Sequence, residues 1–307
     1  MDADAGAHDN QPLQDSYWLD FYEAAWAYRA DAIDKMIKDG EHQPLRLIRR
    51  LAALESRSTL IHYKSSGVTA LVPKLYPGHD ESPDGCPSFM TTSLRGKYVR
   101  VPFHYGSTPT SDYLSDYIEK NGPYDAIIEL GCGYGRNLIE LYYGGGPKGI
   151  NYIGGELTSS GRRLAAILAD LDKDFSAQFL KFDHTLPDMS HFPTFKRPLI
   201  FTVHSIEQVH KLSLEFFRIV SKAAPDVTCL HFEPFGFQVA DLGVVTRRHR
   251  ELIISKNWNI NMASLLKEAS ASGLIRLHYV ATEIFFSRDP LNPTSLAIWS
   301  ASSRERY

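Results

Sequence analysis

The sequence predicts an α/β protein with a mostly parallel sheet that ends in an antiparallel pair of strands. The first observation is an apolar, strand-like run, Ala126–Leu130, followed by a glycine turn and a helical pattern that begins at Arg136. The second is the alternation of apolar runs and helical patterns that follows, which is typical of parallel strands joined by crossover helices. The third is a pair of long strand-like segments, Leu274–Phe286 and Ser295–Ser302, whose short connection predicts a hairpin.

The chain divides into three regions. Residues 1–14 are small and polar, and we expect them to be disordered. Residues 15–105 are expected to form a helical cap, because helical patterns begin at Ser16 and fill Pro44–Ser56. A Pro/Gly-rich passage in this region, Val72–Pro87, predicts a long loop. Residues 106–307 hold the sheet.

The remaining elements follow in chain order. Lys97–Phe103 is strand-like, and Ser111 is the expected N-cap of a helix over Asp112–Lys120. The strand-like segments after the opening unit are Ile150–Gly155, Ala177–Phe182, Pro198–Val203 and Val227–Phe232, and the helical segments are Ser160–Leu171, Ser213–Ala223 and Asn261–Ser272. A sheet of this kind binds ligands beyond the carboxyl ends of its strands, where the strand order reverses.

Composition excludes several classes of protein. With 43% hydrophobic and 22% charged residues among 307, the chain is that of an ordinary folded protein. The net charge of −3 does not indicate a DNA-binding protein. The basic cluster Arg247–Arg250 could be a local site for a partner or a solvent-exposed face of a helix. The three cysteines, Cys86, Cys132 and Cys229, are too far apart to predict a disulfide framework or a metal site. The polar N-terminus and the absence of any apolar run of about 20 residues favour a soluble, cytoplasmic protein without a membrane span.

The glycine turn predicts a nucleotide-like ligand. Glycine permits positive φ and a close approach of the ligand, and the following helix offers unpaired N–H groups. A dinucleotide fold requires G-x-G-x-x-G, whereas the spacing here is G-x-G-x-G. The string Ile128-Glu-Leu-Gly-Cys-Gly-Tyr-Gly135 resembles motif I of the class I S-adenosylmethionine-dependent methyltransferases. That resemblance covers residues from about 106 to the C-terminus and implies a Rossmann-like, seven-stranded sheet.

The resemblance also implies roles for individual residues. The glycine turn would face the amino-acid end of the cofactor, with Glu129 near its ammonium group. Glu156 would accept both ribose hydroxyls, since one carboxylate can take two O–H donors. Asp183 would lie near the adenine, and His204 near the transferred methyl group. The implied cofactor-binding set is Glu129, Gly131, Cys132, Gly133, Gly135, Arg136, Glu156, Leu157, Asp183, His184 and His204.

The methyl acceptor is expected to lie beside the fourth and fifth strands. His204, Glu207 and Glu233 are the candidate catalytic residues, because they follow the ends of those strands. Two carboxylates near the aromatic residues Phe232, Phe235 and Phe237 favour a cationic acceptor, and therefore a small molecule methylated at an amine or guanidine nitrogen. The aromatic residues of the first helix, Tyr17, Trp18, Tyr22 and Trp26, are expected to close the pocket as a lid or to pack on the core.

Two other readings remain open. The chain could be a protein or RNA methyltransferase that uses the cluster Arg247–Arg250, or a module that binds S-adenosylmethionine without catalysis. The sequence contains neither the Asn/Asp-Pro-Pro-Tyr signature of base-amino methyltransferases nor a metal-binding set of the catechol type. It does not indicate an oligomeric state.

Overall fold

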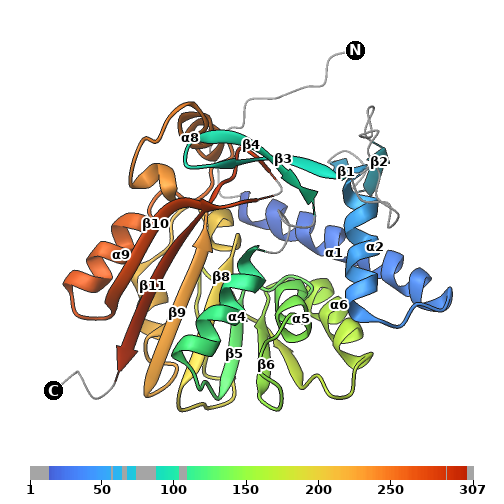
Figure 1. Ribbon diagram of the computed structural model, residues 1–307, viewed down its shortest axis with the longest axis horizontal. Helices are drawn as coiled ribbons and strands as arrows, with labels where there is room; N and C mark the ends of the chain where they lie inside the picture. The colour runs from blue at the N-terminus through green and yellow to red at the C-terminus, as the bar shows by residue number, and fades with distance from the viewer. Residues whose placement is uncertain are drawn as a thin grey trace.

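The computed structural model of the protein describes residues 14–56, 58–63, 68–73, 88–103, 109–287 and 289–302. The disordered tail expected for residues 1–14 lies almost entirely outside these ranges, as do residues 74–87 of the expected loop. In Figure 1 a large twisted sheet forms the centre of the molecule, and the N-terminal helices and strands lie across its upper end.

The central sheet has seven strands and is mostly parallel. Its order is β10-β11-β9-β8-β5-β6-β7. The strands run over Ala126–Leu130 (β5), Asn151–Gly155 (β6), Ala177–Leu180 (β7), Pro198–Val203 (β8), Asp226–Glu233 (β9), Arg276–Phe285 (β10) and Thr294–Ser302 (β11). Only β11 is antiparallel to its neighbours, β9 and β10. The predicted fold class is therefore confirmed, including the C-terminal hairpin.

Helices cover both faces of this sheet. They are α4 (Pro109–Asn121), α5 (Arg136–Tyr143), α6 (Ser159–Asp170), α7 (Leu214–Val220) and α9 (Met262–Ala271), whereas α8 (Val244–Ser255) lies at the upper end of the sheet beside β4 (Lys97–Pro102) (Figure 1). Strand β5 is buried on both faces: Ile127 packs with α4, α5 and α6, and Ile128 packs with α7 and α9. A strand buried on both sides reads as a continuous apolar run, which is why the sequence identified it.

The strand order reverses between β5 and β8. Strand β5 pairs with β6 on one side and with β8 on the other, all in parallel. The chain leaves the carboxyl ends of β5 and β8 in opposite directions, so a crevice opens between them. The glycine turn and His204 both lie at this reversal point.

The N-terminal region contains more strands than the sequence suggested. Helices α1 (Gln14–Lys38) and α2 (Pro44–Ser56) are accompanied by the hairpins β1–β2 (Ser58–Tyr63 and Val68–Pro73) and β3–β4 (Phe89–Leu94 and Lys97–Pro102). Of these strands only β4 was predicted. Figure 1 shows α1, β3 and β4 at the end of the sheet to which the parallel strands point their carboxyl ends.

One predicted helix boundary is wrong. Helix α4 begins at Pro109, so Ser111 lies inside the first turn and not at the N-cap, and its hydroxyl is buried without a hydrogen-bond partner. Proline is well suited to the first helical position, because its missing N–H would have no partner there. Among the described residues, no helix has the length and apolar character needed to cross a bilayer.

Candidate active site

The glycine turn has the backbone conformation that its sequence predicts. Gly131, Gly133 and Gly135 have φ values of 78°, 54° and 74°, a region that other residues adopt only with strain. The N–H groups of Gly131 and Cys132 donate to the Gly155 carbonyl at 2.7 and 3.0 Å, which ties the turn to the end of β6. A Cβ on Gly131 would lie 2.3 Å from the Cβ of Ser205. Glycine is therefore required at this position.

Glu129 carries a buried oxygen without a partner. Its side chain is fully buried in β5, and Oε1 accepts a hydrogen bond of 2.6 Å from the Asn137 amide. Oε2 has no hydrogen-bond partner. Burial raises the pKa of Glu129 well above its usual range, Glu156 and Glu140 add to this effect, and the Asn137 amide opposes it. A cationic donor at Oε2 would stabilise the charged carboxylate, so the residue fits the ammonium group that the family resemblance assigns to it.

Glu156 is already engaged by its own chain. Its Oε1 accepts hydrogen bonds from the N–H and hydroxyl of Thr158 at 2.9 and 2.6 Å, and its Oε2 accepts one from the Gly133 N–H at 2.9 Å. The carboxylate thus joins the glycine turn to the N-terminus of α6. Two oxygens offer about four acceptor positions, so Glu156 retains one for a ribose hydroxyl.

The residues after β7 form a turn beside the glycine turn. Asp183 Oδ1 accepts from the N–H and hydroxyl of Thr185 at 2.7 and 2.6 Å. His184 is buried and lies 3.1 Å from the Ser205 hydroxyl through Nε2, while its Nδ1 has no partner. Burial lowers the pKa of His184 to about 4, so this imidazole is neutral at pH 7.

Three members of the predicted cofactor-binding set, Cys132, Arg136 and Leu157, interact with other groups of the chain. Burial raises the pKa of Cys132, which places a neutral thiol inside the turn. Arg136 forms an ion pair of 2.7 Å with Glu140 on the same helix. The Leu157 carbonyl accepts a hydrogen bond of 2.7 Å from Arg162. The structure therefore brings these residues to the crevice but gives them partners of their own.

Helix α1 closes over the glycine turn. The Glu23 carboxylate accepts from the backbone N–H groups of Ser159 and Ser160 at 2.6 and 2.9 Å, which caps the N-terminus of α6. One turn further along α1, the ring of Trp26 lies 3.0 Å from the position of a Cβ on Gly133. Tyr22 stacks on Trp26 with ring centroids 6.2 Å apart. The side chains of residues 17 and 18 lie outside the described part of the helix.

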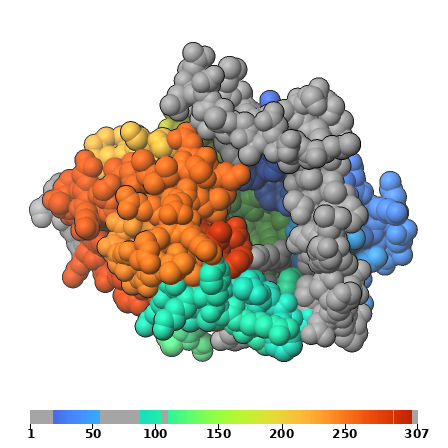
Figure 2. All heavy atoms as spheres, turned by 90° about the horizontal axis from the view of Figure 1, so that it is seen from above, coloured from blue at the N-terminus to red at the C-terminus, as the bar shows by residue number. Residues whose placement is uncertain are grey.

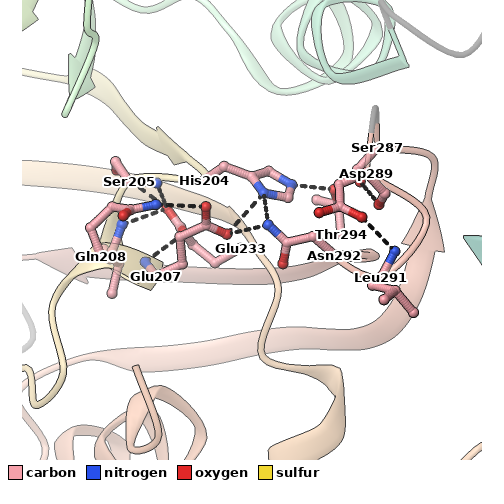
Figure 3. Close-up of polar contacts among 11 residues, drawn as sticks. His204, Ser205, Glu207, Gln208, Glu233, Ser287, Asp289, Leu291, Asn292 and Thr294 are labelled. Carbon is pink, nitrogen blue, oxygen red and sulfur yellow. Dashed lines mark hydrogen bonds and ion pairs between the residues drawn. The ribbon is translucent and has the colours of Figure 1, made fainter. Parts of the chain in front are cut away.

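His204 stands at the centre of a polar network at the end of β8 (Figure 3). It has a positive φ of 49°, which costs free energy for a residue other than glycine. Its Nδ1 lies 3.1 Å from Glu207 Oε2, and its Nε2 lies 2.5 Å from the Thr294 hydroxyl. Asn292 donates to Glu207 Oε2 at 2.7 Å. Burial lowers the pKa of His204, but the neighbouring carboxylates of Glu207 and Glu233 outweigh it, so the pKa is raised.

Glu233 holds the loop that carries His204. Its Oε1 accepts from the backbone N–H groups of Ser205 and Ile206 at 3.1 and 3.2 Å, and its Oε2 accepts from that of Glu207 at 3.3 Å. The side chain is 1% exposed, and burial raises its pKa to about 7. Glu207 is also buried, and its Oε1 accepts from the Gln208 amide at 2.8 Å. The three predicted catalytic residues are together, but both carboxylates are occupied by protein donors.

Sequence reasoning missed Asn292, Thr294, Ser205 and Glu23. Asn292 and Thr294 belong to the tip of the β10–β11 hairpin, about 90 residues from His204 along the chain. Ser205 lies between the predicted catalytic residues His204 and Glu207. Glu23 lies between Tyr22 and Trp26, whose aromatic side chains predict a lid or a packing contact and not a polar one. No local pattern marks such residues, because their partners come from distant elements.

The three arginines of the basic cluster on α8 are exposed, and two of them have partners within the chain. Arg247 pairs with Asp241 at 2.9 Å, and Arg248 donates to the Tyr98 hydroxyl at 3.3 Å. His249 is fully buried. No group of three or more potential metal-ligating side chains occurs within the described ranges.

Strand order identifies the architecture. The parallel run β7-β6-β5-β8-β9, the antiparallel β11 between β9 and β10, and a G-x-G-x-G turn after β5 occur together. This is the class I methyltransferase fold. No family model and no curated protein matches the sequence.

Solved methyltransferase structures resemble the chain only distantly. Magnesium protoporphyrin IX methyltransferase from Synechocystis PCC 6803, with bound SAH, is 13% identical, with a TM-score of 0.46 over 64% of this chain and 83% of that chain. The CcbJ methyltransferase from Streptomyces caelestis is 12% identical, with a TM-score of 0.44 over 66% and 94% of the two chains. A geranyl diphosphate methyltransferase in complex with GPP and sinefungin is 12% identical, with a TM-score of 0.38 over 62% and 77%. These distant similarities assign no function, which has to be argued from the site.

Proposed function

We propose that the protein transfers a methyl group from S-adenosylmethionine to a small-molecule acceptor. The observation that carries this proposal is the buried Oε2 of Glu129, which has no partner and lies directly before three glycines of positive φ. An unpaired buried carboxylate oxygen is costly, and the ammonium group of the cofactor would offset that cost. S-adenosylmethionine supplies an activated methyl group on a sulfonium when it is bound.

The residues proposed to hold the cofactor lie at the carboxyl ends of three successive strands, β5, β6 and β7. Glu129 binds the ammonium group, and the glycine turn admits the amino-acid end. Glu156 accepts a ribose hydroxyl while it keeps its bonds to Gly133 and Thr158. Asp183 and the adjoining His184 are the residues proposed to lie near the adenine, as the family resemblance implies. The ring of Trp26 packs against Gly133, so α1 forms the wall of the site opposite the sheet.

His204 is the residue that handles the acceptor proton. Glu207 orients its Nδ1, and the raised pKa makes Nε2 a stronger base. The Thr294 hydroxyl at 2.5 Å from Nε2 connects this base to the acceptor. The acceptor atom gives up its proton through Thr294 to His204 as it forms its bond to the methyl carbon.

The expectation of an amine or guanidine acceptor loses its support. It rested on two carboxylates that face the acceptor, yet Glu233 binds three backbone N–H groups and Glu207 binds His204, Asn292 and Gln208. A base assisted by a hydroxyl suits an acceptor that carries a removable proton, such as an alcohol. Glu233 is a positioning residue in this scheme, since it acts only through the loop of His204.

Two measurements test the proposal. Titration calorimetry with S-adenosylmethionine and S-adenosylhomocysteine is expected to show binding of both; binding of neither, or of NAD instead, would overturn it. Methyl-labelled cofactor incubated with metabolite, protein and RNA fractions is expected to label the metabolite fraction. Label in protein or RNA would favour a macromolecular acceptor, and binding without transfer to any fraction would favour a non-catalytic module.

A further inference from the structure

The hydroxyl end of Tyr22 on α1 lies near two carboxylates of the proposed active site. Burial is the main cause of the raised pKa of this phenol, the charge of Glu207 raises it further, Arg29 opposes this effect, and Glu156 adds to it. Interactions between charges weaken with distance and are largely screened beyond about 10 Å. Glu156 follows β6 and Glu207 follows β8, which flank β5 on its two sides. The Tyr22 hydroxyl is therefore located over the point where the strand order reverses.

Contacts of α1 fix the position of this side chain. The Tyr22 ring stacks on the ring of Trp26, one turn further along the helix, with the two planes 25° apart. Trp26 in turn packs against Gly133 of the glycine turn. The carboxylate of the adjacent residue, Glu23, binds the N-terminus of α6, and the Glu23 carbonyl accepts from the Ser160 hydroxyl at 2.8 Å. Helix α1 is thus held both at the glycine turn and at α6.

A hollow at the carboxyl ends of the strands lies beside α1. Figure 2 looks down on these ends and shows the hollow between the red C-terminal strands and the blue N-terminal helix. Tyr22 is partly buried, so it is neither sealed in the core nor spread over the outer surface. Thr294, whose hydroxyl lies 2.5 Å from His204 Nε2, belongs to the C-terminal hairpin. The elements that carry Tyr22 and Thr294 therefore border the same hollow.

The charges around the Tyr22 hydroxyl favour a cation. The two carboxylates disfavour a third negative charge beside them, so the phenol stays neutral. A neutral hydroxyl has one donor and two acceptor lone pairs, and it can therefore face a cation even while its O–H group donates elsewhere. The charge of Arg29 is offset in part, because its guanidinium forms an ion pair of 2.5 Å with Glu55.

The cation expected at this position is the sulfonium of the methyl donor. In the proposed function Glu156 accepts a ribose hydroxyl, and Glu207 orients His204 at 3.1 Å for the acceptor. The transferred methyl group then passes between these two carboxylates, which is where the Tyr22 hydroxyl lies. The sulfur of S-adenosylmethionine is positively charged, whereas that of S-adenosylhomocysteine is a neutral thioether. A group that contacts this position distinguishes the donor from the product by charge.

We propose that the hydroxyl oxygen of Tyr22 contacts the sulfonium end of the methyl donor, and that the site thereby binds S-adenosylmethionine more tightly than S-adenosylhomocysteine. This inference rests on the proposed methyl transfer. It gives Tyr22 a catalytic role beyond that of a lid, because the side chain touches the cofactor beside the reacting carbon. Transfer of the methyl group removes the charge on sulfur, so the product is held less tightly than the donor.

The test is titration calorimetry of the full chain with each of the two ligands. The wild type is expected to bind S-adenosylmethionine at least about fivefold more tightly than S-adenosylhomocysteine. Tyr22→Phe removes only the oxygen and keeps the ring on Trp26. It is expected to weaken binding of S-adenosylmethionine about fivefold and to change that of S-adenosylhomocysteine by about twofold at most. Equal losses for the two ligands would overturn the inference.

Tyr28→Phe is the matched control. It removes the same atom from the same helix, but six residues further along and about 240° around the helix axis, so both affinities are expected to stay at the wild-type values. A loss of donor affinity in Tyr28→Phe equal to that in Tyr22→Phe would also overturn the inference, because the effect would then not be specific to the site.

The wild type separates this inference from the proposed function. If it binds neither ligand, the proposed function fails. If it binds both ligands with equal affinity, only the contact of Tyr22 with the sulfonium fails. Because this comparison needs no variant, the inference is tested even if Tyr22→Phe does not fold, which thermal unfolding of the same samples would reveal.

Discussion

Replacing Glu156 with glutamine would separate its role in the ligand site from its role in the fold. In the structure its Oε1 faces Thr158 and its Oε2 faces the Gly133 N–H. Glutamine has the same shape but only one acceptor oxygen. If that oxygen stays with Thr158, the NH2 group is directed at the Gly133 N–H, and a buried donor loses its partner.

The size of both effects follows from the hydrogen bonds. Loss of one buried partner costs about 1–3 kcal/mol of unfolding free energy. A hydrogen bond to a charged acceptor contributes about 1.5–3 kcal/mol and one to a neutral acceptor about 0.5–1.5 kcal/mol, so a ribose hydroxyl loses about 1 kcal/mol. That loss corresponds to a Kd about fivefold higher.

Calorimetry with S-adenosylhomocysteine and urea unfolding would measure the two effects on the same samples. Asp125→Asn is the matched control, because the Asp125 carboxylate also holds two backbone N–H groups, those of Lys196 and Arg197 at 2.7 and 3.0 Å. It precedes β5, at the end of the strand opposite the glycine turn, so the control is expected to lose stability and keep its cofactor affinity. If Glu156→Gln behaves like the control, Glu156 only supports the turn and the ribose assignment is refuted.

Three further predictions follow from the same contacts. Glu23→Gln replaces the charged cap of α6, so the contact that holds α1 is weakened by about 1 kcal/mol. Stopped-flow measurements are expected to show that S-adenosylhomocysteine dissociates about fivefold faster. An unchanged rate would mean that α1 does not cover the cofactor. Burial raises the pKa of Glu233 in the folded state to about 7 from an ordinary 4.5. The folded state therefore keeps this proton to a higher pH than the unfolded state. The resulting stability is present below pH 4.5 and is lost as the pH rises through 7. The difference between 4.5 and about 7 predicts that the free energy of unfolding in urea falls by about 3 kcal/mol between those pH values in the wild type and not in Glu233→Gln. Equal slopes for both proteins would contradict it. Gly131→Ala places a Cβ 2.3 Å from the Cβ of Ser205 at a positive φ. This change is expected to lower the free energy of unfolding by about 2–4 kcal/mol and therefore to lower the Tm. An unchanged Tm would show that the turn can relax.

Local patterns were sufficient for most of the sheet and for the conformation of the glycine turn. Strands β5 and β8 are buried on both faces, and glycine adopts the φ values of the turn without strain. Strand β3 was missed because its sequence, Phe-Met-Thr-Thr-Ser-Leu, lacks a clear alternation. Helix α8 was missed because its charged residues favoured a surface cluster over an element that buries Thr246 and His249.

The acceptor side shows where pattern reasoning fails. Glu207 and Glu233 were correctly expected to lie near His204, since residues that follow adjacent parallel strands meet at one edge of the sheet. Their partners were not predictable. Whether a carboxylate is free or occupied depends on groups that approach from elsewhere, such as Asn292 from the hairpin and the backbone N–H groups of the His204 loop.

The sequence alone determined the strands of the central sheet, the class of fold and the position of the glycine turn, because these depend on periodicity and on φ values that only glycine adopts with ease. Tertiary structure decided which polar groups are paired. It tied Glu233 to a loop, left one oxygen of Glu129 unpaired, and placed α1 over the turn. Hydrogen bonds between distant elements cause these differences, and no local pattern in the chain encodes them.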